Sequence, residues 1–100
     1  MDLSPSDKLL IQHFFATRPI KKAYLFGSYA RHEANDESDI DILVELDHSQ
    51  PIGMKFFAFQ SDLEELLKKK VDLVSSEGLS RHVRPFVDRD KTLLYERGND

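Results

Sequence analysis

Two aspartates one residue apart, at the start of an alternating apolar run, constrain this chain more than any other feature. Residues 39–46 read Asp-Ile-Asp-Ile-Leu-Val-Glu-Leu. Because side chains alternate between the two faces of a strand, Asp39 and Asp41 lie together on one face. The other face of the predicted strand is apolar and is lined by Ile40, Ile42, Val44 and Leu46. The pattern therefore predicts a strand that packs on one side and presents two carboxylates on the other.

A cation between these carboxylates would remove their mutual repulsion, which is costly in a crowded site. Hard oxygen ligands of this kind suit Mg²⁺ or Mn²⁺. Upstream of Asp39, with ten residues between, an apolar run breaks at Gly27 and Ser28. Gly27 permits backbone torsions and a close approach that a Cβ would resist, and Ser28 can cap the following turn or helix while its hydroxyl and nearby N–H groups face an anion. A metal and a phosphate cradle together predict a nucleotide-binding site.

The order of Gly27-Ser28, ten residues and Asp39-Ile40-Asp41 resembles the signature of the DNA polymerase beta nucleotidyltransferase superfamily. It is most similar to the minimal nucleotidyltransferases, small proteins often paired with a HEPN-domain partner in toxin–antitoxin modules. The family places a third carboxylate on a later strand, and Asp72 stands in that place in this chain. The resemblance extends from about Ala23 to Val74. One position departs from the family, which usually has glycine where this chain has His32.

The resemblance implies an α/β nucleotidyltransferase fold, with a mixed β-sheet of about four strands and helices packed on it. It implies transfer of AMP from ATP to a hydroxyl of a protein partner, a HEPN-domain toxin bound to this chain in a hetero-oligomer. Asp39 and Asp41 would hold the metals, and Asp72 would complete the metal site on the attacking side and orient or deprotonate the hydroxyl. Gly27 and Ser28 would hold the triphosphate.

Other interpretations of these residues remain open. A lone pair of aspartates is most often a solvated strand face, and the preceding Gly-Ser is what favours a functional site. Two other functions also fit the pattern: a catalytically inactive antitoxin that neutralises its partner by binding, and nucleotidyl transfer to a small molecule. Arg81, His82 and Arg84 could approach a triphosphate, although a surface role fits them more simply.

Length and charge narrow the class of protein. A chain of 100 residues predicts one domain over 1–100 with a modest core, and its small size favours a partner. The absence of cysteine and of a long apolar run fits a cytoplasmic protein without a membrane span. Because the net charge is −4, a nucleic acid is not the expected substrate.

Periodicity and turn residues predict the remaining elements. Three apolar aromatics, Phe56, Phe57 and Phe59, cannot all face one core, so we expect Phe57 to be exposed and to mark a protein interface. A proline inside the last predicted helix, Pro85, is expected to break or kink it. The predicted helices cover 4–17, 28–33, 52–69 and 79–88, the predicted strands cover 20–26, 39–46, 71–75 and 92–95, and the tail 96–100 is expected to fray.

Overall fold

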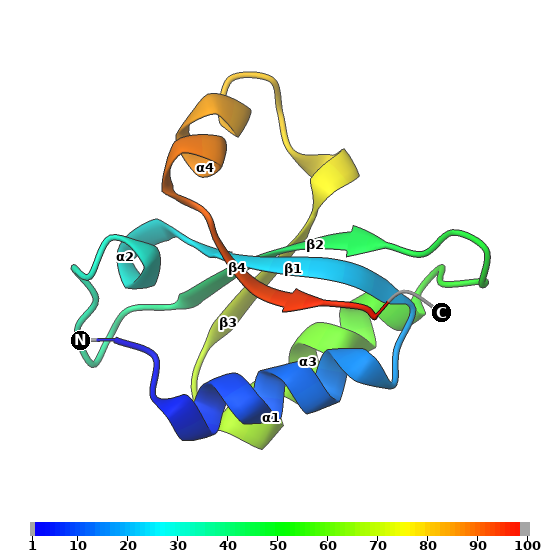
Figure 1. The fold of residues 1–100 in the computed structure, drawn as a ribbon, viewed down its shortest axis with the longest axis horizontal. Coiled ribbons are helices and arrows are strands. Elements are labelled where there is room, and N and C mark those ends of the chain that lie inside the picture. Colours follow the sequence, from blue (N-terminus) through cyan, green and yellow to red (C-terminus); the bar gives the residue numbers. More distant parts are fainter. Residues whose placement is uncertain (1, 99–100) are drawn as a thin grey trace.

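A mixed four-stranded sheet forms the centre of the computed structural model, which describes residues 2–98 (Figure 1). The strand order is β3-β2-β1-β4. This arrangement confirms the expected α/β fold. The elements are α1 (Pro5–Ala16), β1 (Ile20–Phe26), α2 (Gly27–Ala30), β2 (Ile40–Leu46), α3 (Lys55–Leu67), β3 (Val71–Ser75), the 3-10 turn η1 (Ser76–Gly78), α4 (Arg84–Asp90) and β4 (Thr92–Glu96).

Strand directions bring three distant parts of the chain to one end of the sheet. β1 pairs antiparallel with both β2 and β4, whereas β2 and β3 run parallel and are joined through α3. The end of β1 therefore lies beside the start of β2, where Phe26 is opposite Asp41. On the other side of β2, Asp41 is opposite Asp72. The turn after β1 and the first residues of β2 and β3 thus meet.

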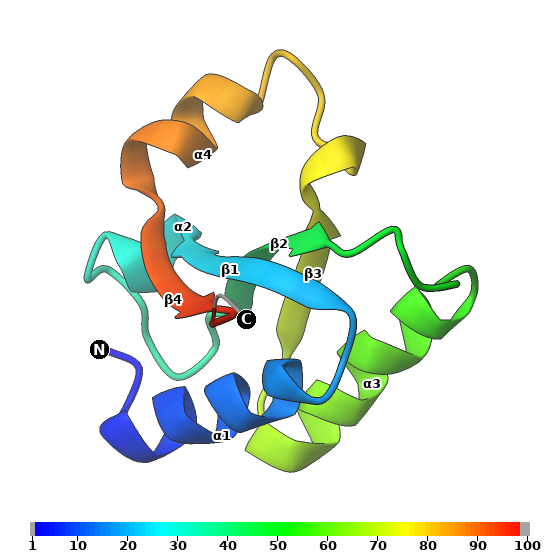
Figure 2. The ribbon, with the colours of Figure 1, turned by 45° about the vertical axis from the view of Figure 1, so that its right-hand side comes forward.

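One face of the sheet is covered by α1 and α3, which lie next to each other (Figures 1 and 2). The helix α1 begins where the sequence predicts, since Ser4 Oγ accepts a hydrogen bond from the Asp7 N–H at 3.1 Å and Pro5 occupies the first turn. The core under the helices contains the apolar face of β2 as predicted. Its fully buried larger side chains are Phe15, Ile11, Ile20, Ile40, Ile42, Leu63 and Val44.

The opposite face of the sheet is partly covered by η1 and α4, which project from it (Figure 2). Val87 is the buried residue of α4, and Leu43 of β2 is also buried outside the main core under α1 and α3. Because Asp41 and Leu43 alternate with core residues along β2, they face this second side. The aspartates and α4 are therefore on the same side of the sheet.

Three local expectations are corrected. Pro85 does not break a helix but lies in the first turn of α4, where its missing N–H has no intrahelical partner to lose. Helix α3 is shorter than expected because Lys68 caps it in the left-handed conformation, with φ of 58°. Glu96 belongs to β4, and Arg97 donates from Nη1 to Asp47 Oδ2 at 2.6 Å. These two residues are therefore fixed by contacts and do not belong to a frayed tail. Residues 99–100 of the expected frayed tail lie outside the described residues.

The exposed aromatic on α3 is the predicted one. Phe57 is 66% exposed, whereas Phe59 is buried and Phe56 packs against the core. No helix within residues 2–98 is long and apolar enough to cross a membrane.

Candidate active site

Gly27 forms the turn where β1 ends, and the structure explains why a glycine stands there. Its φ of +71° lies in the left-handed region, and a Cβ built on it would come within 2.1 Å of Asp41 Oδ2. A side chain would therefore clash with the carboxylate as well as strain the backbone. The close approach of a backbone turn to Asp41 places the predicted phosphate cradle against the predicted metal ligand.

Ser28 follows in the single helical turn α2, with its side chain half-buried. The end of this turn is closed by two hydrogen bonds: Glu33 N–H donates to Ser28 O at 2.9 Å, and His32 N–H donates to Tyr29 O at 3.3 Å. His32 has a φ of 61°, the conformation that such a helix end requires of the residue after its cap. The histidine therefore adopts the glycine-like geometry, and its Nδ1 shares a hydrogen bond of 2.6 Å with Asp2 Oδ1.

Asp41 is the half-buried carboxylate of the site. Burial, together with the negative charges of Asp72 and Asp39, raises its pKa to about 6, while the Arg31 guanidinium acts in the opposite direction. The ionised form of Asp41 is therefore destabilised by burial and by two neighbouring negative charges. A cation bound beside it would stabilise this ionised form, so the position favours a cation site.

Asp72 and Asp39 are both exposed, and the structure places them differently. Asp72 is the cross-strand neighbour of Asp41 in the parallel pair of β2 and β3. Asp39 precedes β2 and acts on Asp41 through its charge. The structure therefore brings Asp41 and Asp72 side by side, with Asp39 close to them.

As the side chains stand, no three Asp, Glu or His residues between 2 and 98 are gathered tightly enough to hold one metal ion. The donor set nevertheless fits Mg²⁺ or Mn²⁺, since it consists of carboxylate oxygens alone and their negative charge is not balanced. A metal that used all three aspartates would require their side chains to turn toward one another.

Arg31 is a residue of this site that sequence reasoning missed. It donates from Nη1 to Asp90 Oδ2 at 3.1 Å and from Nε to Glu33 Oε2 at 3.2 Å. The first bond joins the end of α2 to the end of α4 across 59 positions of the chain. No pattern in the sequence pairs these two residues, because only the folded sheet brings the helices together.

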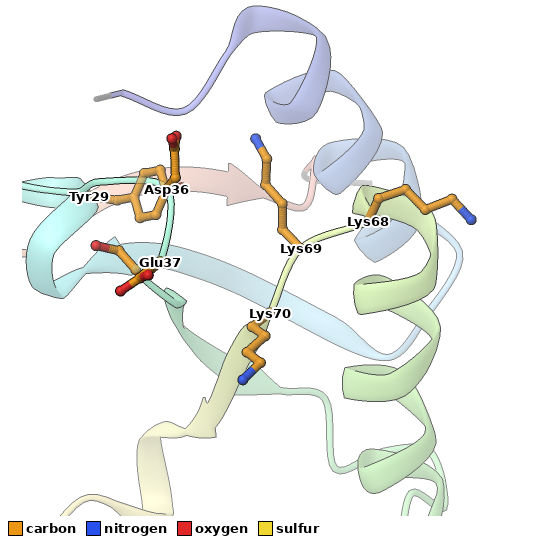
Figure 3. A pocket seen from close by; sticks show the side chains of 7 residues that line it. Tyr29, Asp36, Glu37, Lys68, Lys69 and Lys70 are labelled. Carbon is orange, nitrogen blue, oxygen red and sulfur yellow. The ribbon is translucent and has the colours of Figure 1, made fainter.

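A pocket of about 820 Å³ opens at the edge formed by the residues that precede β2 and β3, and Asp39, Asp41 and Asp72 are not among its lining residues. Figure 3 shows Tyr29, Asp36 and Glu37 on one side of this pocket and three lysines on the other. A backbone hydrogen bond joins the two segments beside the pocket, since Ile40 N–H donates to Lys70 O at 2.9 Å. Among the lysines, Lys69 donates to Asp7 Oδ2 at 2.9 Å, and the complete lining is Tyr29, Asp36, Glu37, Ser38, Lys68, Lys69 and Lys70.

Comparison with known families and proteins gives concordant results. Residues 10–100 match the family described as polymerase beta nucleotidyltransferase. A relative from Methanocaldococcus jannaschii, provisionally named a protein adenylyltransferase, is 40% identical over 77 residues, which are 76% of each chain. The protein adenylyltransferase MntA of Thermococcus cleftensis is 38% identical over 71 residues, which are 71% of each chain.

Two solved structures resemble this chain in fold. One is a toxin–antitoxin complex with AMP-PNP, with a TM-score of 0.73 and 24% identity over 93% of this chain and 74% of that one. The other contains a tri-AMPylated HEPN toxin of Shewanella oneidensis bound to an MNT antitoxin, with a TM-score of 0.70 and 22% identity over 91% and 71% of the two chains. At these identities the likeness concerns the fold alone.

Proposed function

Because this chain belongs to the polymerase beta nucleotidyltransferase family, we propose that it transfers AMP from ATP to a hydroxyl group of a protein partner. One observation carries this proposal: Asp41 and Asp72 are neighbours on parallel strands, and Asp41 lies directly against the Gly27 turn. The names of the two archaeal relatives, both adenylyltransferases that act on proteins, support the choice of donor and acceptor.

In this proposal Gly27 and Ser28 bind the triphosphate. The close contact of the Gly27 backbone with the Asp41 carboxylate brings phosphate and carboxylate to the same point, where their charges would repel each other without a cation. Asp39 and Asp41 would hold the Mg²⁺ or Mn²⁺ that accompanies the triphosphate, and Asp72 would complete the metal site on the attacking side. Such an ion, when bound, neutralises phosphate charge and favours ionisation of a nearby hydroxyl.

The chain contributes the position of the acceptor and a destination for its proton. Asp72 is exposed, so an incoming hydroxyl can reach it without displacing other side chains. The hydroxyl oxygen attacks the α-phosphorus in line, its proton passes to Asp72, and the bond from the α-phosphorus to the bridging oxygen breaks. Pyrophosphate leaves, and the acceptor keeps the AMP group.

The partner in this proposal is a HEPN-domain toxin that the chain binds in a hetero-oligomer and inactivates as its antitoxin. The likeness in fold to an MNT antitoxin in complex with an AMPylated HEPN toxin supports this partner. Since ATP is the donor, we place the reaction in the cytoplasm.

The test uses the purified chain, the HEPN-domain protein encoded beside it, ATP and Mg²⁺, and mass spectrometry of the HEPN protein. Asp72→Asn keeps the shape of the side chain and removes its charge. We expect it to preserve stabilisation by ATP and metal while lowering transfer by ~10²-fold or more, the typical effect of losing a positioned proton acceptor. Asp39→Asn combined with Asp41→Asn should abolish both.

Glu45→Gln is the matched control, because Glu45 is on the same face of β2 but farther along the strand. It should behave as the unmodified chain does. Equal transfer by Asp72→Asn would show that the third carboxylate is wrongly assigned. A wild-type chain that neutralises the toxin without modifying it would replace the enzyme with a binding antitoxin.

A further inference from the structure

The segment Arg81–Asp90, here called the α4 arm, is exposed almost throughout. Val87 is its buried residue and Asp90 is half-buried, while every other position faces solvent. Two of the exposed positions are apolar: Val83 is 46% exposed and Phe86 is 58% exposed. Because they are three residues apart in helical geometry, they are neighbours on the surface of the arm. Neighbouring exposed apolar side chains offer a contact that another protein can cover.

The α4 arm lies on the side of the sheet opposite α1 and α3 (Figures 1 and 2), and alternation along β2 directs Asp41 to this same side. The other large exposed apolar residues of the helices, among them Met54 and Phe57, belong to α1, to α3 or to the N-terminal cap of α3, on the opposite side. A protein acceptor has to present its hydroxyl to Asp72, so it has to approach the side of the α4 arm. The apolar residues of α1 and α3 and those of the α4 arm are all exposed. Only those of the α4 arm lie on the side from which the acceptor would approach.

Charge distinguishes the α4 arm from the rest of the chain. It contains three arginines, Arg81, Arg84 and Arg89, in a chain whose net charge is −4. Its two aspartates are both paired with cations, Asp88 with Lys91 at 3.0 Å, and Asp90 with Arg31 at 3.1 Å and with Arg89 at 3.5 Å. The exposed surface of the arm is therefore both apolar and basic.

The arm is held in a fixed relation to the site. Arg31 joins its last residue to the phosphate-binding turn, and Lys91 Nζ lies 4.7 Å from the centroid of the Tyr24 ring on β1. On the exposed surface, the Arg89 guanidinium lies 5.3 Å from the centroid of the Phe86 ring, which orients this side chain. A partner bound to the arm would consequently be held in register with the aspartates.

We propose that the α4 arm is the docking surface for the protein acceptor, and that it recognises an apolar side chain flanked by acidic residues near the modified hydroxyl. This inference rests on the proposed function for the nature of the partner. The acidic character follows from charge complementarity with Arg81 and Arg84, since Arg89 is paired with Asp90 at 3.5 Å, and the apolar contact follows from Val83 and Phe86.

The experiment compares two phenylalanines of similar exposure on opposite sides of the sheet. Phe86→Ser and Phe57→Ser are made in the full chain, and calorimetry measures the affinity of each for the HEPN-domain protein encoded beside it, without ATP. We expect Phe86→Ser to weaken binding by ~10-fold or more, as loss of a central aromatic contact does, and Phe57→Ser to change it little. The acceptor KM should rise by the same factor, while the shift in melting temperature caused by ATP and Mg²⁺ stays unchanged.

Arg81→Glu supplies an independent readout. It should weaken binding and reduce the dependence of the affinity on ionic strength, because it removes a charge contact. Weaker binding by Phe57→Ser but not by Phe86→Ser would overturn the proposal, as would equal binding by all variants. If light scattering shows self-association that Phe86→Ser abolishes, the surface joins two copies of this chain, and the proposal is also wrong.

Failure of the proposed function gives a different result. If the wild type binds the HEPN-domain protein through Phe86 but transfers no AMP to it, the docking surface stands and the enzyme assignment falls. If it does not bind that protein at all, both are overturned.

Discussion

Gly27 is the residue whose replacement has the clearest expected effect. Gly27→Ala would place a methyl group within 2.1 Å of Asp41 Oδ2 and would force alanine into a φ of +71°. We expect the variant to lose stabilisation by ATP and metal and to melt at a lower temperature, since left-handed backbone alone costs about 1–2 kcal/mol for a residue with a Cβ. Differential scanning fluorimetry with and without ATP and Mg²⁺ measures both effects.

The chain offers a matched control at Gly53. Its φ of +49° is also left-handed, but a Cβ there would meet no atom within 4 Å. Gly53→Ala should therefore show the backbone cost without the loss of ligand binding. If the two variants respond alike to ATP, the contact with Asp41 has no role in the site.

The raised pKa of Asp41 predicts two opposite pH dependences. The stability of the free chain falls as the pH rises, whereas its stabilisation by ATP and metal increases. Its folded pKa of about 6 lies above the ordinary value of 3.8, so its contribution to stability is present below pH 3.8 and is lost as the pH rises through 6. Binding of metal requires the ionised carboxylate and therefore strengthens over the same interval. We expect the melting-temperature gain from ATP and Mg²⁺ to be larger at about pH 7 than at about pH 5.

Asp41→Asn provides the comparison for this titration. Without ATP and metal, the variant should lack the fall in stability between these two pH values. Asp47 does not confuse the measurement, because hydrogen bonds from Ser49 and Arg97 hold its pKa below the ordinary value, and it stays ionised throughout. A ligand-induced gain that is equal at both pH values would contradict the assignment of Asp41.

At the scale of residues, the sequence is most informative where chemistry and spacing coincide. Gly27, Ser28, Asp39 and Asp41 stand out because a turn glycine followed at a fixed distance by two carboxylates on one strand face rarely arises from packing alone. The link between Arg31 and Asp90 has no such signal, because both are ordinary surface residue types and their contact depends on how two helices meet. The roles of these four residues in the site are predictions. The substitutions described above test them for Gly27, Asp39 and Asp41.

At the scale of elements, the outer edge of β3 is protected by side chains of α3. Gln60 Oε1 accepts a hydrogen bond from the Leu73 N–H at 3.0 Å, and Glu64 Oε2 accepts one from the Val71 N–H at 3.0 Å. A bare strand edge invites pairing with other chains, and these contacts occupy its donors. The helix that crosses from β2 to β3 thus also closes the edge of the sheet.

Replacement of both side chains tests this protection. Gln60→Ala with Glu64→Ala should lower the free energy of unfolding by about 1 kcal/mol for each bond and should increase aggregation on heating. Chemical denaturation measures the first effect and light scattering the second. Glu65→Ala, at an exposed neighbouring position of α3, is the control and should change neither. Unchanged stability of the double variant would mean that water replaces these acceptors without cost.

Most helices and strands could be predicted from local sequence signals, and α4 shows why one could not. Helices α1 and α3 have a cap or an amphipathic stripe that fixes their position in the sequence. In α4 one residue, Val87, is buried, so the sequence of this segment has no amphipathic pattern that would predict a helix. Pro85 is as consistent with the start of a helix as with a break in one. The choice between the two depends on the sheet surface that receives Val87, which a single sequence does not display.

At the scale of the whole molecule, exposed apolar residues lie on both sides of the sheet, at Phe57 and at Phe86. A chain of 100 residues with an exposed apolar surface at Val83 and Phe86, on the side that Asp41 faces, should form a stable complex with the HEPN-domain partner proposed above, with an interface above roughly 1,000 Å². Co-expression followed by size-exclusion chromatography with light scattering measures the assembly. A chain that elutes as a monomer in the presence of the partner would contradict this expectation.

The strand order has a consequence for a chain that is still being synthesised. The strand β1 is central in the finished sheet, but its two neighbours differ in their distance along the chain, because β2 is the next strand and β4 follows only after β3 and α4. Residues 20–75, which include β1, β2 and β3, are therefore made before residues 92–96, which form β4. Whenever the first three strands pair before β4 joins them, the outer edge of β1 is open to neighbouring chains, and the addition of β4 closes that edge.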